Sequence, residues 1–294
     1  MKIIYWVNTQ DPKYGFCKDL ESSLKKKHQV EVINDRDFKI EEFVDKCNKS
    51  DLLLYHQGGI WMTNEMDYTM SLERLKQMLQ MVKCKKVCWF VEKGWFLNNE
   101  TLEQTIPLND LTFLNDETWF RRHKFDKEKV FPLHTACRER VKGEYNEKYK
   151  CDIAFYGQVL AYRQPFIDYL KDKYGRKFKV WNFLFGKDLA DLIASAKIIF
   201  SPIQPNDEFY WDNRIYEVLN QGGVLIYPKL YGLEEEGFEA GKHYLGYKDI
   251  KLAVDMMDEY LKDDKKLKEI SQQGQKFVKK FTYDARLSEI FKRL

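Results

Sequence analysis

The stretch NRIYEVLNQGGVLIYP, residues 213–228, is the part of the sequence that decides the fold. Residues 213–221 are typical of a helix, and Gly222-Gly223 end it because glycine permits the tight turn that follows a helix. Residues 224–228 are an apolar, β-rich run typical of a buried strand. A helix followed so closely by such a strand is the repeating unit of an α/β fold with a parallel sheet.

The segments around this stretch continue the alternation through the second half of the chain. The first strand of this half, CDIAFYG, ends in a glycine. The pattern predicts strands at 151–157, 178–183, 197–203 and 224–228, and helices at 163–173, 188–196, 213–221, 249–262, 264–280 and 283–293. We expect one parallel sheet with helices on both faces.

The first half alternates in the same way. Strands are predicted at 2–7, 29–33, 52–56, 86–91, 111–114 and 130–133, and helices at 16–27, 41–48, 66–82 and 116–124. The polar, charged segment 138–150 is typical of a linker. The predicted fold class is therefore α/β, with two Rossmann-like parallel-sheet domains, 1–142 and from 143 onward. The carboxyl ends of their strands, where such sheets bind ligands, can face each other across a cleft.

Composition narrows the class of protein. The 294 residues carry a net charge of +3, which is +2 in residues 1–150 (26 basic, 24 acidic) and +1 in residues 151–294 (23 basic, 22 acidic). Neither half is the strongly basic body of a protein that lives on nucleic acid. We find no apolar run of membrane-spanning length and no signal peptide. Six scattered cysteines without a CxxC pair favour free thiols and a cytoplasmic location, in a bacterial or phage-infected cell.

Arg214 and Glu217 lie three residues apart and therefore share one face of the predicted helix at 213–221. The amino end of a helix offers free N–H groups and a positive dipole end, so a phosphate beside Arg214 is favoured. Glu217, one turn further along, can accept hydrogen bonds from ribose hydroxyls. An ordinary surface ion pair would look the same in the sequence, and that alternative stays open.

The end of the strand at 151–157 offers a second phosphate-binding feature. Gly157 lets a ligand approach the backbone closely, and Arg163 stands at the start of the following helix, where it can hold a phosphate. A plain strand-to-helix turn explains the same residues. The sequence contains neither the glycine fingerprint of dinucleotide-binding domains nor a P-loop.

Residues 151–290 resemble the C-terminal, nucleotide-sugar-binding domain of GT-B glycosyltransferases. The similarity rests on Tyr156-Gly157 to Arg163, on Arg214-x-x-Glu217, on Gly222-Gly223 and on the closing pattern GQKFVKKFTYDARL. The chain looks like the CgeB-like, spore-maturation type, with a glycosyltransferase family 1-like C-terminal domain. It also resembles phage DNA β-glucosyltransferases, in which an Arg-x-x-Glu helix follows a loop such as PNDEFYWDNR, residues 205–214.

The resemblance implies a donor and the residues that bind it. Arg214 would bind the donor pyrophosphate and Glu217 the donor ribose. The donor is expected to be a nucleotide-diphosphate sugar, uridine-based, and no cofactor or metal is implied. The last helix would pack back on the N-terminal domain as segment 281–294, which leaves 143–280 as the donor domain. The implied donor-binding residues are Gly157, Arg163, Tyr210, Asn213, Arg214 and Glu217, and Tyr210, Trp211 and Asp212 can contact the sugar.

The stretch WFVEKGW, residues 89–95, supplies the candidate catalytic residue. Glu92 follows a buried strand of the first domain, and DNA glucosyltransferases have an acidic base in a similar setting. A carboxylate there can take the proton from an acceptor hydroxyl as it attacks the anomeric carbon, which predicts inversion. A solvated loop acid is the alternative, and Asp11 and Asp116 are weaker candidates for the base. The acceptor side is assigned to Asn8, Gln57 and Gly58.

Other chemistries lack their motifs. The five histidines show no metal-ligand spacing, and no serine lies in a G-x-S-x-G motif. His56 ends a strand and can touch an acceptor, although a structural role explains it better. Arg121–Lys124 form the best local basic cluster for a phosphate backbone, with a solvated surface as the default.

Four functions are consistent with these features. The first is transfer of a sugar to a glycan, a lipid-linked or a protein hydroxyl. The second is the same transfer to a hydroxymethylated base in DNA, against which the near-neutral charge argues, since DNA affinity depends on phosphate contacts. A non-catalytic nucleotide-sugar binder and a sugar-phosphate phosphorylase or epimerase are the others. We expect a metal-independent glycosyltransferase.

Overall fold

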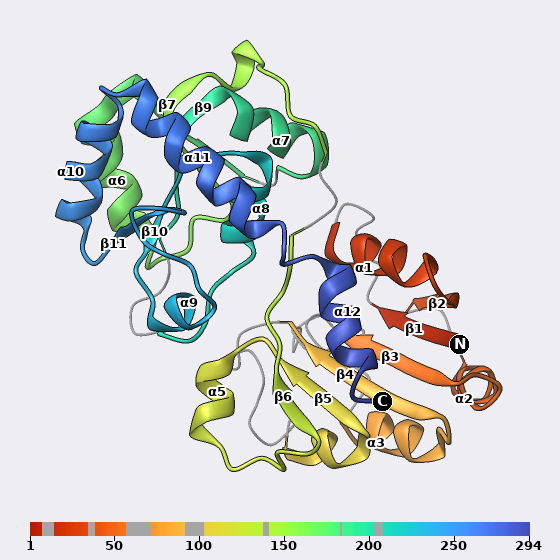
Figure 1. Cartoon of the computed structure of the whole chain (residues 1–294). Helices are drawn as coiled ribbons and strands as arrows, with labels where there is room; N and C mark the ends of the chain where they lie inside the picture. Colours follow the sequence, from red (N-terminus) through yellow and green to blue (C-terminus); the bar gives the residue numbers. More distant parts are fainter. Residues whose placement is uncertain are drawn as a thin grey trace. The chain divides into compact units, whose positions relative to one another are not determined.

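The protein is seen in a computed structural model that describes residues 1–7, 15–34, 39–56, 72–91, 103–137, 141–182, 184–202 and 208–294. The chain forms two compact units. The first unit comprises Met1–Thr135 with Tyr283–Leu294, and the second comprises Ala136–Thr282. Each unit contains one sheet flanked by helices (Figure 1).

The first unit is built on a six-stranded sheet in the order β2-β1-β3-β4-β5-β6, with every neighbouring pair parallel. Parallel strands need crossover segments that cover the sheet, so they are buried on both faces and read as continuous apolar runs. The strands are β1 Lys2–Val7, β2 Gln29–Asn34, β3 Leu52–His56, β4 Lys85–Phe90, β5 Leu111–Leu114 and β6 Val130–Pro132.

Helices cover both faces of this sheet. Alternate strand residues such as Trp6 and Tyr55 pack with Phe43 of one helix and Leu75 of another on one face. On the opposite face, Trp89 lies 6.4 Å from Tyr283, ring centre to ring centre. The helices of the unit are α1 Gly15–Lys25, α2 Ile40–Asn48, α3 Leu72–Met81, α5 Glu117–Arg122 and α12 Tyr283–Phe291, with a short 3-10 turn η2 Ile106–Leu108.

The last helix, α12, is part of the first unit although it follows the second unit in the sequence. The Lys26 ammonium contacts the Asp284 carboxylate at 3.0 Å, and Arg286 Nε donates to the Thr135 carbonyl at 3.3 Å. The unit boundary after Thr135 lies before the expected one at residue 142. The reason is that Cys137 N donates to the Phe281 carbonyl at 2.8 Å, which joins residues 136–137 to the end of the second unit.

The second unit has a five-stranded parallel sheet in the order β11-β10-β9-β7-β8. Its strands are β7 Cys151–Tyr156, β8 Phe178–Trp181, β9 Ala196–Phe200, β10 Leu225–Pro228 and β11 Leu245–Tyr247. Its helices are α6 Gln164–Tyr174, α7 Gly186–Ser195, α8 Arg214–Gln221, α9 Tyr231–Glu235, α10 Ile250–Tyr260 and α11 Asp264–Val278, with 3-10 turns η3 Glu147–Tyr149 and η4 Gly175–Lys177.

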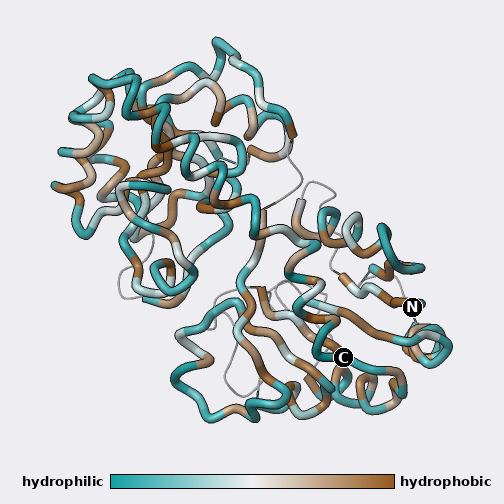
Figure 2. Tube along the Cα trace, in the orientation of Figure 1, coloured by the Kyte–Doolittle hydropathy of each residue, from teal (hydrophilic) through white to brown (hydrophobic). Residues whose placement is uncertain are grey.

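This sheet is also buried on both faces. Tyr156 and Tyr227 face a core shared with α7 and α8, whereas Phe155 and Ile226 face a core shared with α6 and α10. The strands accordingly follow the brown, hydrophobic part of the trace, while the outer helices carry many teal positions (Figure 2). Read from their second strands, both sheets have the same order, β2-β1-β3-β4-β5 and β8-β7-β9-β10-β11.

The structure confirms the prediction of two α/β units with parallel sheets. The helix expected at 213–221 is observed at Arg214–Gln221, and Gly222 ends it in the left-handed region with φ of +79°. Gly222 N and Gly223 N donate to the carbonyls of Leu219 and Val218, which satisfies the last turn. Strand β11 and helix α9 were not predicted, because three and five residues are too short to show a periodic pattern.

Candidate functional site

The sheet of the second unit reverses its strand order between β7 and β9, because β8 lies on one side of β7 and the later strands lie on the other. In open parallel sheets, ligands bind at the carboxyl ends of the strands at such a switch point. The segment after β7 carries Gly157 and Arg163, and the segment leading into α8 carries Asp212 and Arg214.

Arg214 reaches from the first turn of α8 to the end of β7. Its Nε donates to the Tyr156 carbonyl at 3.2 Å, and its Nη1 contacts the Asp212 carboxylate. Its Nη2 lies over Gly157, where a Cβ would collide with it, and the φ of Gly157 is +111°. The close approach that we expected at Gly157 is therefore made by the guanidinium of Arg214.

Arg163 immediately precedes α6 and is buried at the same place. Its Nη1 donates to the Gln158 carbonyl at 2.8 Å, and its Nε donates to the Pro202 carbonyl at 3.4 Å. Its Nη2 lies 3.9 Å from Oδ2 of Asp212. The fold therefore brings Arg163 and Arg214 together, fifty-one positions apart in the sequence (214 − 163 = 51), around one carboxylate.

Asp212 stands between the two guanidiniums. Its Oδ2 faces both arginines, and its Oδ1 accepts from the Tyr227 hydroxyl at 3.1 Å and from Arg214 N at 3.2 Å. The side chains of Arg163 and Arg214 are 10% and 12% exposed, and that of Asp212 is 24% exposed. One negative charge thus serves two positive charges in a largely desolvated position. We refer to Arg163, Asp212 and Arg214 as the arginine cluster.

The pKa shifts of the two arginines reflect this unequal sharing. Burial, and then the charge of Arg214, lower the pKa of the Arg163 guanidinium. Burial also acts to lower the pKa of Arg214, but the Asp212 carboxylate and further acceptors around it outweigh burial and raise that pKa. An arginine stays protonated in proteins, so both guanidiniums remain cations and present an excess of positive charge.

Glu217 lies on the same helix face as Arg214, as the spacing predicts, and both contact Tyr156. The Tyr156 hydroxyl donates to Glu217 Oε2 at 3.1 Å, while the Tyr156 carbonyl accepts from Arg214. Burial, followed by the charge of Glu217, raises the pKa of Tyr156 well above its usual value, so its hydroxyl keeps its proton. Glu217 also lines a small hollow between α7 and α8, with Val141, Gly186, Leu189, Ala190, Ile193, Asn220 and Gln221.

The remaining donor-side residues lie just before α8. Tyr210 is half-buried, and Asn213 is the residue before the helix, whose carbonyl accepts from Glu217 N at 2.9 Å. The expectation that Trp211 contacts a sugar is wrong. Trp211 is fully buried, and its Nε1 donates to the Tyr216 hydroxyl at 3.0 Å, so it presents no surface to a ligand. Its role is to anchor the loop in the core.

Tyr156 and Tyr227 are the site residues that sequence analysis missed. Both are strand residues with the burial of core positions, and their hydroxyls reach the charged groups Glu217 and Asp212. The available signal was the position of Tyr156 next to Gly157 at the end of a strand. No comparable signal marks Tyr227, because its partner Asp212 becomes adjacent only when β10 is placed in the sheet.

The predicted catalytic and acceptor-side residues of the first unit lie outside the described residues. These are Glu92, Asn8, Gln57 and Gly58, together with the weaker base candidate Asp11. Asp116, the other weaker candidate, is described. It is buried and caps α5 by accepting from Trp119 N at 3.3 Å. This is a structural role at the start of a helix.

His56 ends β3 at the carboxyl edge of the first sheet, next to the switch point between β1 and β3. Its Nε2 lies 3.1 Å from the thiol sulfur of Cys17 in α1, and the Phe16 ring meets the imidazole edge-to-face at 5.2 Å. Burial lowers the pKa of His56 to about 4. The imidazole is therefore neutral at pH 7, and its contacts among the described residues are with a thiol and an aromatic ring.

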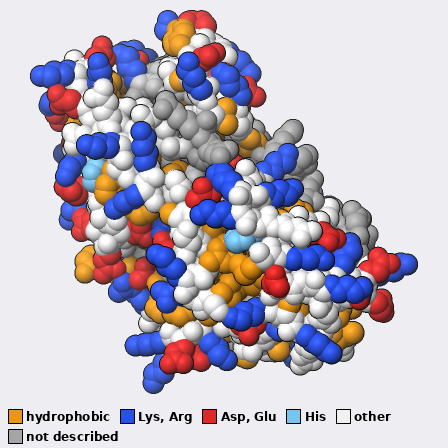
Figure 3. Space-filling view, turned by 45° about the vertical axis from the view of Figure 1, so that its right-hand side comes forward, with side chains coloured by type: hydrophobic (Ala, Val, Ile, Leu, Met, Phe, Trp, Pro, Cys, Tyr) orange, Lys and Arg blue, Asp and Glu red, His pale blue; other side chains and the backbone are white. Residues whose placement is uncertain are grey.

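The basic cluster at Arg121–Lys124 is partly engaged within the first unit. Arg121 Nη2 contacts Glu117 at 2.7 Å, and the His123 ring stacks on Trp119 at 4.1 Å. Side chains of both signs are intermixed on the face of the molecule seen in Figure 3, in agreement with the small net charge. No single-sign field covers that face.

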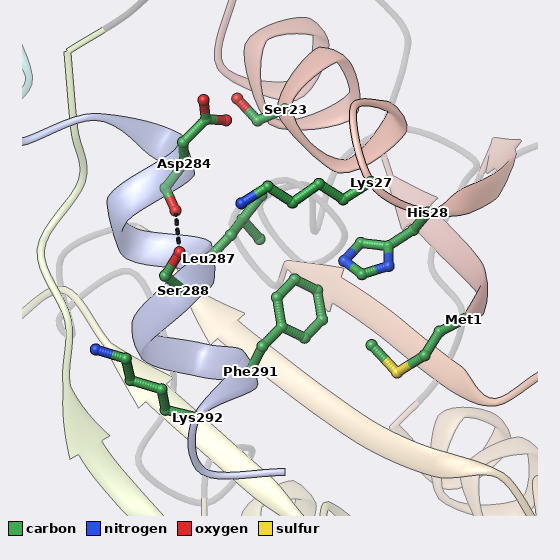
Figure 4. A pocket seen from close by; sticks show the side chains of 9 residues that line it. All are labelled: Met1, Ser23, Lys27, His28, Asp284, Leu287, Ser288, Phe291 and Lys292. Carbon is green, nitrogen blue, oxygen red and sulfur yellow. Dashed lines mark hydrogen bonds between the residues drawn. The ribbon is translucent and has the colours of Figure 1, made fainter.

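A hollow of about 380 Å³ in the first unit lies at the opposite edge of its sheet. It is formed by Met1, by residues in and after the last turn of α1 and by α12. Figure 4 shows Lys27 and Lys292 with the ring of Phe291, and the Ser288 hydroxyl donating to the Asp284 carbonyl at 2.8 Å. Met1 and His28 precede β1 and β2, so this hollow is at the amino ends of the strands, where parallel sheets do not place their ligands.

The described residues contain no group of three or more His, Cys, Asp or Glu side chains arranged to hold a metal ion. In the same part of the chain we find no helix with the length and apolar character that a membrane crossing requires.

The comparison with protein families decides the class. Residues 138–292, more than half of the chain, match the family described as glycosyl transferase-like. The chain belongs to this glycosyltransferase family. The match contains the arginine cluster, Gly157, Glu217 and the Gly222-Gly223 turn, so the residues that suggested the resemblance all fall inside it. No curated protein sequence matches the chain.

Solved structures show the GT-B fold over the whole length of the chain. The Anabaena protein Alr3699/HepE, in complex with UDP and glucose, is 12% identical with a TM-score of 0.70 and full coverage of both chains. An alpha-glucosyltransferase in complex with UDP-glucose and DNA is 11% identical with a TM-score of 0.73, covering 99% of this chain and 98% of its own.

A third similar structure is named as a different kind of enzyme. The putative UDP-N-acetylglucosamine 2-epimerase of Listeria monocytogenes is 11% identical with a TM-score of 0.56, covering 99% of this chain and 94% of its own. At these identities the similarity establishes the fold alone. Transferases and an epimerase thus share this architecture, and the family match is what assigns the chain to the glycosyltransferases.

Proposed function

We propose that this glycosyltransferase uses a uridine diphosphate sugar as its donor and binds it at the arginine cluster. The single observation that carries the proposal is the convergence of Arg163 and Arg214 at the carboxyl end of β7, beside the amino end of α8. Two guanidiniums and a helix amino end are the groups that bind phosphates in proteins. Support for uridine comes from similar structures that were solved with UDP or UDP-glucose.

Glu217 is proposed to bind the ribose. It is one turn further along α8 than Arg214, and a carboxylate accepts hydrogen bonds from vicinal hydroxyls. The Tyr156 hydroxyl orients its Oε2 at 3.1 Å. Glu217 also lines the small hollow between α7 and α8. Gly157, Tyr210 and Asn213 would complete the donor side.

The arginine cluster would also act on the reaction itself. When the bond between the anomeric carbon and the diphosphate breaks, negative charge accumulates on the leaving phosphate oxygen. Preorganised guanidiniums stabilise that charge more strongly than they stabilise the intact donor, which lowers the barrier. This role is the basis for proposing a metal-independent reaction.

Glu92 is proposed as the general base that takes the proton from the acceptor hydroxyl. Direct attack would then give a product of inverted configuration. The similar DNA-modifying structure is named an alpha-glucosyltransferase, so the configuration of the product must be measured. A product with the same anomeric configuration as the donor would exclude direct displacement.

A glycan, lipid-linked or protein hydroxyl is proposed as the acceptor, and a modified DNA base is the second candidate. Structures of the alpha-glucosyltransferase with DNA, including a 13-mer with an HMU base, favour the second candidate. The net charge of +3 argues for the first, because DNA binding draws most of its affinity from phosphate contacts. Transfer to DNA would have to weaken steeply as salt is raised.

The first experiment measures thermal stabilisation by a panel of nucleotides and nucleotide sugars. A ligand at 100 times its Kd adds about 2.7 kcal/mol to the free energy of unfolding. UDP or one UDP-sugar should raise the melting temperature of the wild type. Arg214→Ala should weaken its binding about 100-fold, since a desolvated charged contact is lost. Arg176→Ala, which removes an exposed arginine from η4 of the same unit, is the matched control.

The second experiment offers the bound donor to glycan, lipid, protein and hydroxymethylated DNA acceptors, and determines the anomer of the product by NMR. Transfer with inversion supports the proposal in full. Donor turnover that needs no acceptor would identify an epimerase, and dependence on free phosphate a phosphorylase. If no nucleotide stabilises the protein while other ligands do, the donor assignment loses its basis.

A further inference from the structure

The arginine cluster contains its own anion. Among the described residues, Asp212 supplies the carboxylate that contacts Arg214 Nη1, and the same Oδ2 lies 3.9 Å from Arg163 Nη2. These guanidinium groups are the ones that the proposed donor site offers to a diphosphate. A carboxylate and a phosphate compete for the same N–H donors. Both carry anionic oxygens that accept hydrogen bonds from a guanidinium group.

Asp212 is held firmly in this position. The Tyr227 hydroxyl donates to its Oδ1 at 3.1 Å and in turn accepts from its backbone N at 3.1 Å, and Arg214 N donates to Oδ1 at 3.2 Å. Tyr227 is fully buried in β10, where close packing restricts its ring. The carboxylate is therefore fixed at one oxygen and directs the other at the two arginines.

The charge balance shows what this arrangement does. Within the arginine cluster, two cations and one anion leave a single excess positive charge on largely buried side chains, and the Glu217 carboxylate also acts on Arg214. Without Asp212, two neighbouring guanidiniums would repel each other in a low-dielectric position. With it, they are kept in place, but any incoming anion meets a negative charge beside the cations. The Asp212 carboxylate would therefore compensate the two guanidiniums and would also repel another anion that approached them.

We propose that Asp212 is the resident counter-anion of the donor site: it neutralises and orients Arg163 and Arg214 when no donor is bound, and gives them up, in whole or in part, to the diphosphate. This inference rests on the proposed function of the cluster. Its consequence is that Asp212 lowers the affinity for diphosphates in proportion to their charge, which favours release of the nucleotide product.

The test is the affinity of Asp212→Asn for a series of ligands of increasing charge. Asparagine keeps the shape and the oxygen that accepts from Tyr227 and Arg214 N, but removes the negative charge. At pH 7.5 uridine is neutral, while UMP and UDP carry close to two and three negative charges. We expect unchanged affinity for uridine, about threefold tighter binding of UMP and about tenfold tighter binding of UDP, measured by calorimetry. The ligand-free variant should melt at a lower temperature than the wild type.

Asp168→Asn is the matched control. It removes the same charge from an exposed position on α6, where the side chain contacts Gln164, and should leave all three affinities unchanged. Equal or weaker binding of UDP by Asp212→Asn would overturn the inference and make Asp212 a positioning residue only. If the wild type itself binds no uridine nucleotide, the proposed function fails first, and this outcome is distinct because it appears before any variant is compared.

Asp212→Ser guards against a variant that does not fold. A serine hydroxyl can still accept from Arg214 N at the start of α8, and it lacks the charge. The same charge-dependent gain is expected. If both variants are unfolded without ligand, millimolar UDP should refold them, because the diphosphate takes over the role of the carboxylate. Failure of UDP to do so would contradict the proposal.

Discussion

The carboxyl edges of the two sheets occupy the same topological position, but their described residues carry different chemistry. Both sheets reverse their strand order at the corresponding place, between β1 and β3 and between β7 and β9. In the second unit, this edge holds two arginines and a carboxylate. In the first unit, the described part of the edge holds His56, Cys17 and Phe16, with a neutral imidazole.

In the proposed reaction, this difference would separate the donor side from the acceptor side. A diphosphate leaving group needs fixed positive charge, and the second edge provides it. The proposed acceptor hydroxyl is uncharged, and the aromatic side chains described at the first edge would help to exclude competing water from it. One backbone topology therefore supplies two chemically distinct strand ends, and the side chains that end each strand decide which is which.

Lowering the pH should affect the edge with His56 more strongly than the arginine cluster, because guanidiniums stay protonated. The pKa of His56 is about 4 in the folded protein and about 6.5 in the unfolded chain. Its folded-state pKa is depressed, so the stability it supports is present above pH 6.5 and is lost as the pH falls toward 4. Between pH 7 and pH 5, we expect protonation of His56 to lower the free energy of unfolding by about 2 kcal/mol. Denaturant unfolding of the wild type at both pH values measures it.

His56→Gln should remove this part of the pH dependence, whatever it does to stability at pH 7. His28→Gln is the comparison. Burial and nearby positive charges lower the pKa of His28, but the residue is partly exposed. This variant should therefore lose a smaller part of the pH dependence of stability. An unchanged pH profile in His56→Gln would mean that the imidazole is not held neutral, and the contrast between the edges would fail.

Gly157→Ala should disturb the charged edge next most strongly. A Cβ there collides with Arg214 Nη2, and a φ of +111° is unfavourable for alanine. We expect about 30-fold weaker UDP binding, or about 2 kcal/mol, because the guanidinium is displaced. Gly175→Ala has a φ of +53° and nothing within 4 Å of the new Cβ. This control should lose stability but keep its affinity for UDP.

Glu217→Gln should have the smallest effect. It replaces a charged acceptor of the ribose hydroxyls by a neutral one, which is worth about 1 kcal/mol, or about fivefold in the Kd of UDP. The loss should vanish when the ligand is a dideoxyribose analogue of UDP, because that ligand lacks the hydroxyls. A fivefold loss that persists with the analogue would assign Glu217 to the structure of the Tyr156 contact rather than to ribose.

The elements of the fold were predictable because their signals are local. A parallel strand buried on both faces is a continuous apolar run, and a helix end at Gly222 needs only the residue that tolerates a positive φ. The same locality explains why Arg214 and Glu217 were placed on one helix face. Strand β11 and helix α9 were missed because elements of three and five residues are too short to show a periodic hydrophobic pattern.

The wrong assignment of Trp211 shows where local signals end. An aromatic residue in a polar loop looks like a ligand contact, yet its ring is buried against Gly232 and hydrogen-bonded to Tyr216. Nothing in the neighbouring sequence says which way a loop side chain points. That depends on the helices and strands that surround the loop after folding.

The sequence by itself determined the two α/β units, the positions of most strands and helices, and the arginine and glutamate that α8 presents together. Only the tertiary structure decided that Arg163 and Arg214 share Asp212, that Tyr227 holds this carboxylate, and that Cys17 meets His56. Each of these pairs joins segments that are distant in the chain or lie on different elements. Periodicity and spacing describe neighbours along one element, whereas the charge balance of a site depends on which elements the packed sheet brings to one edge.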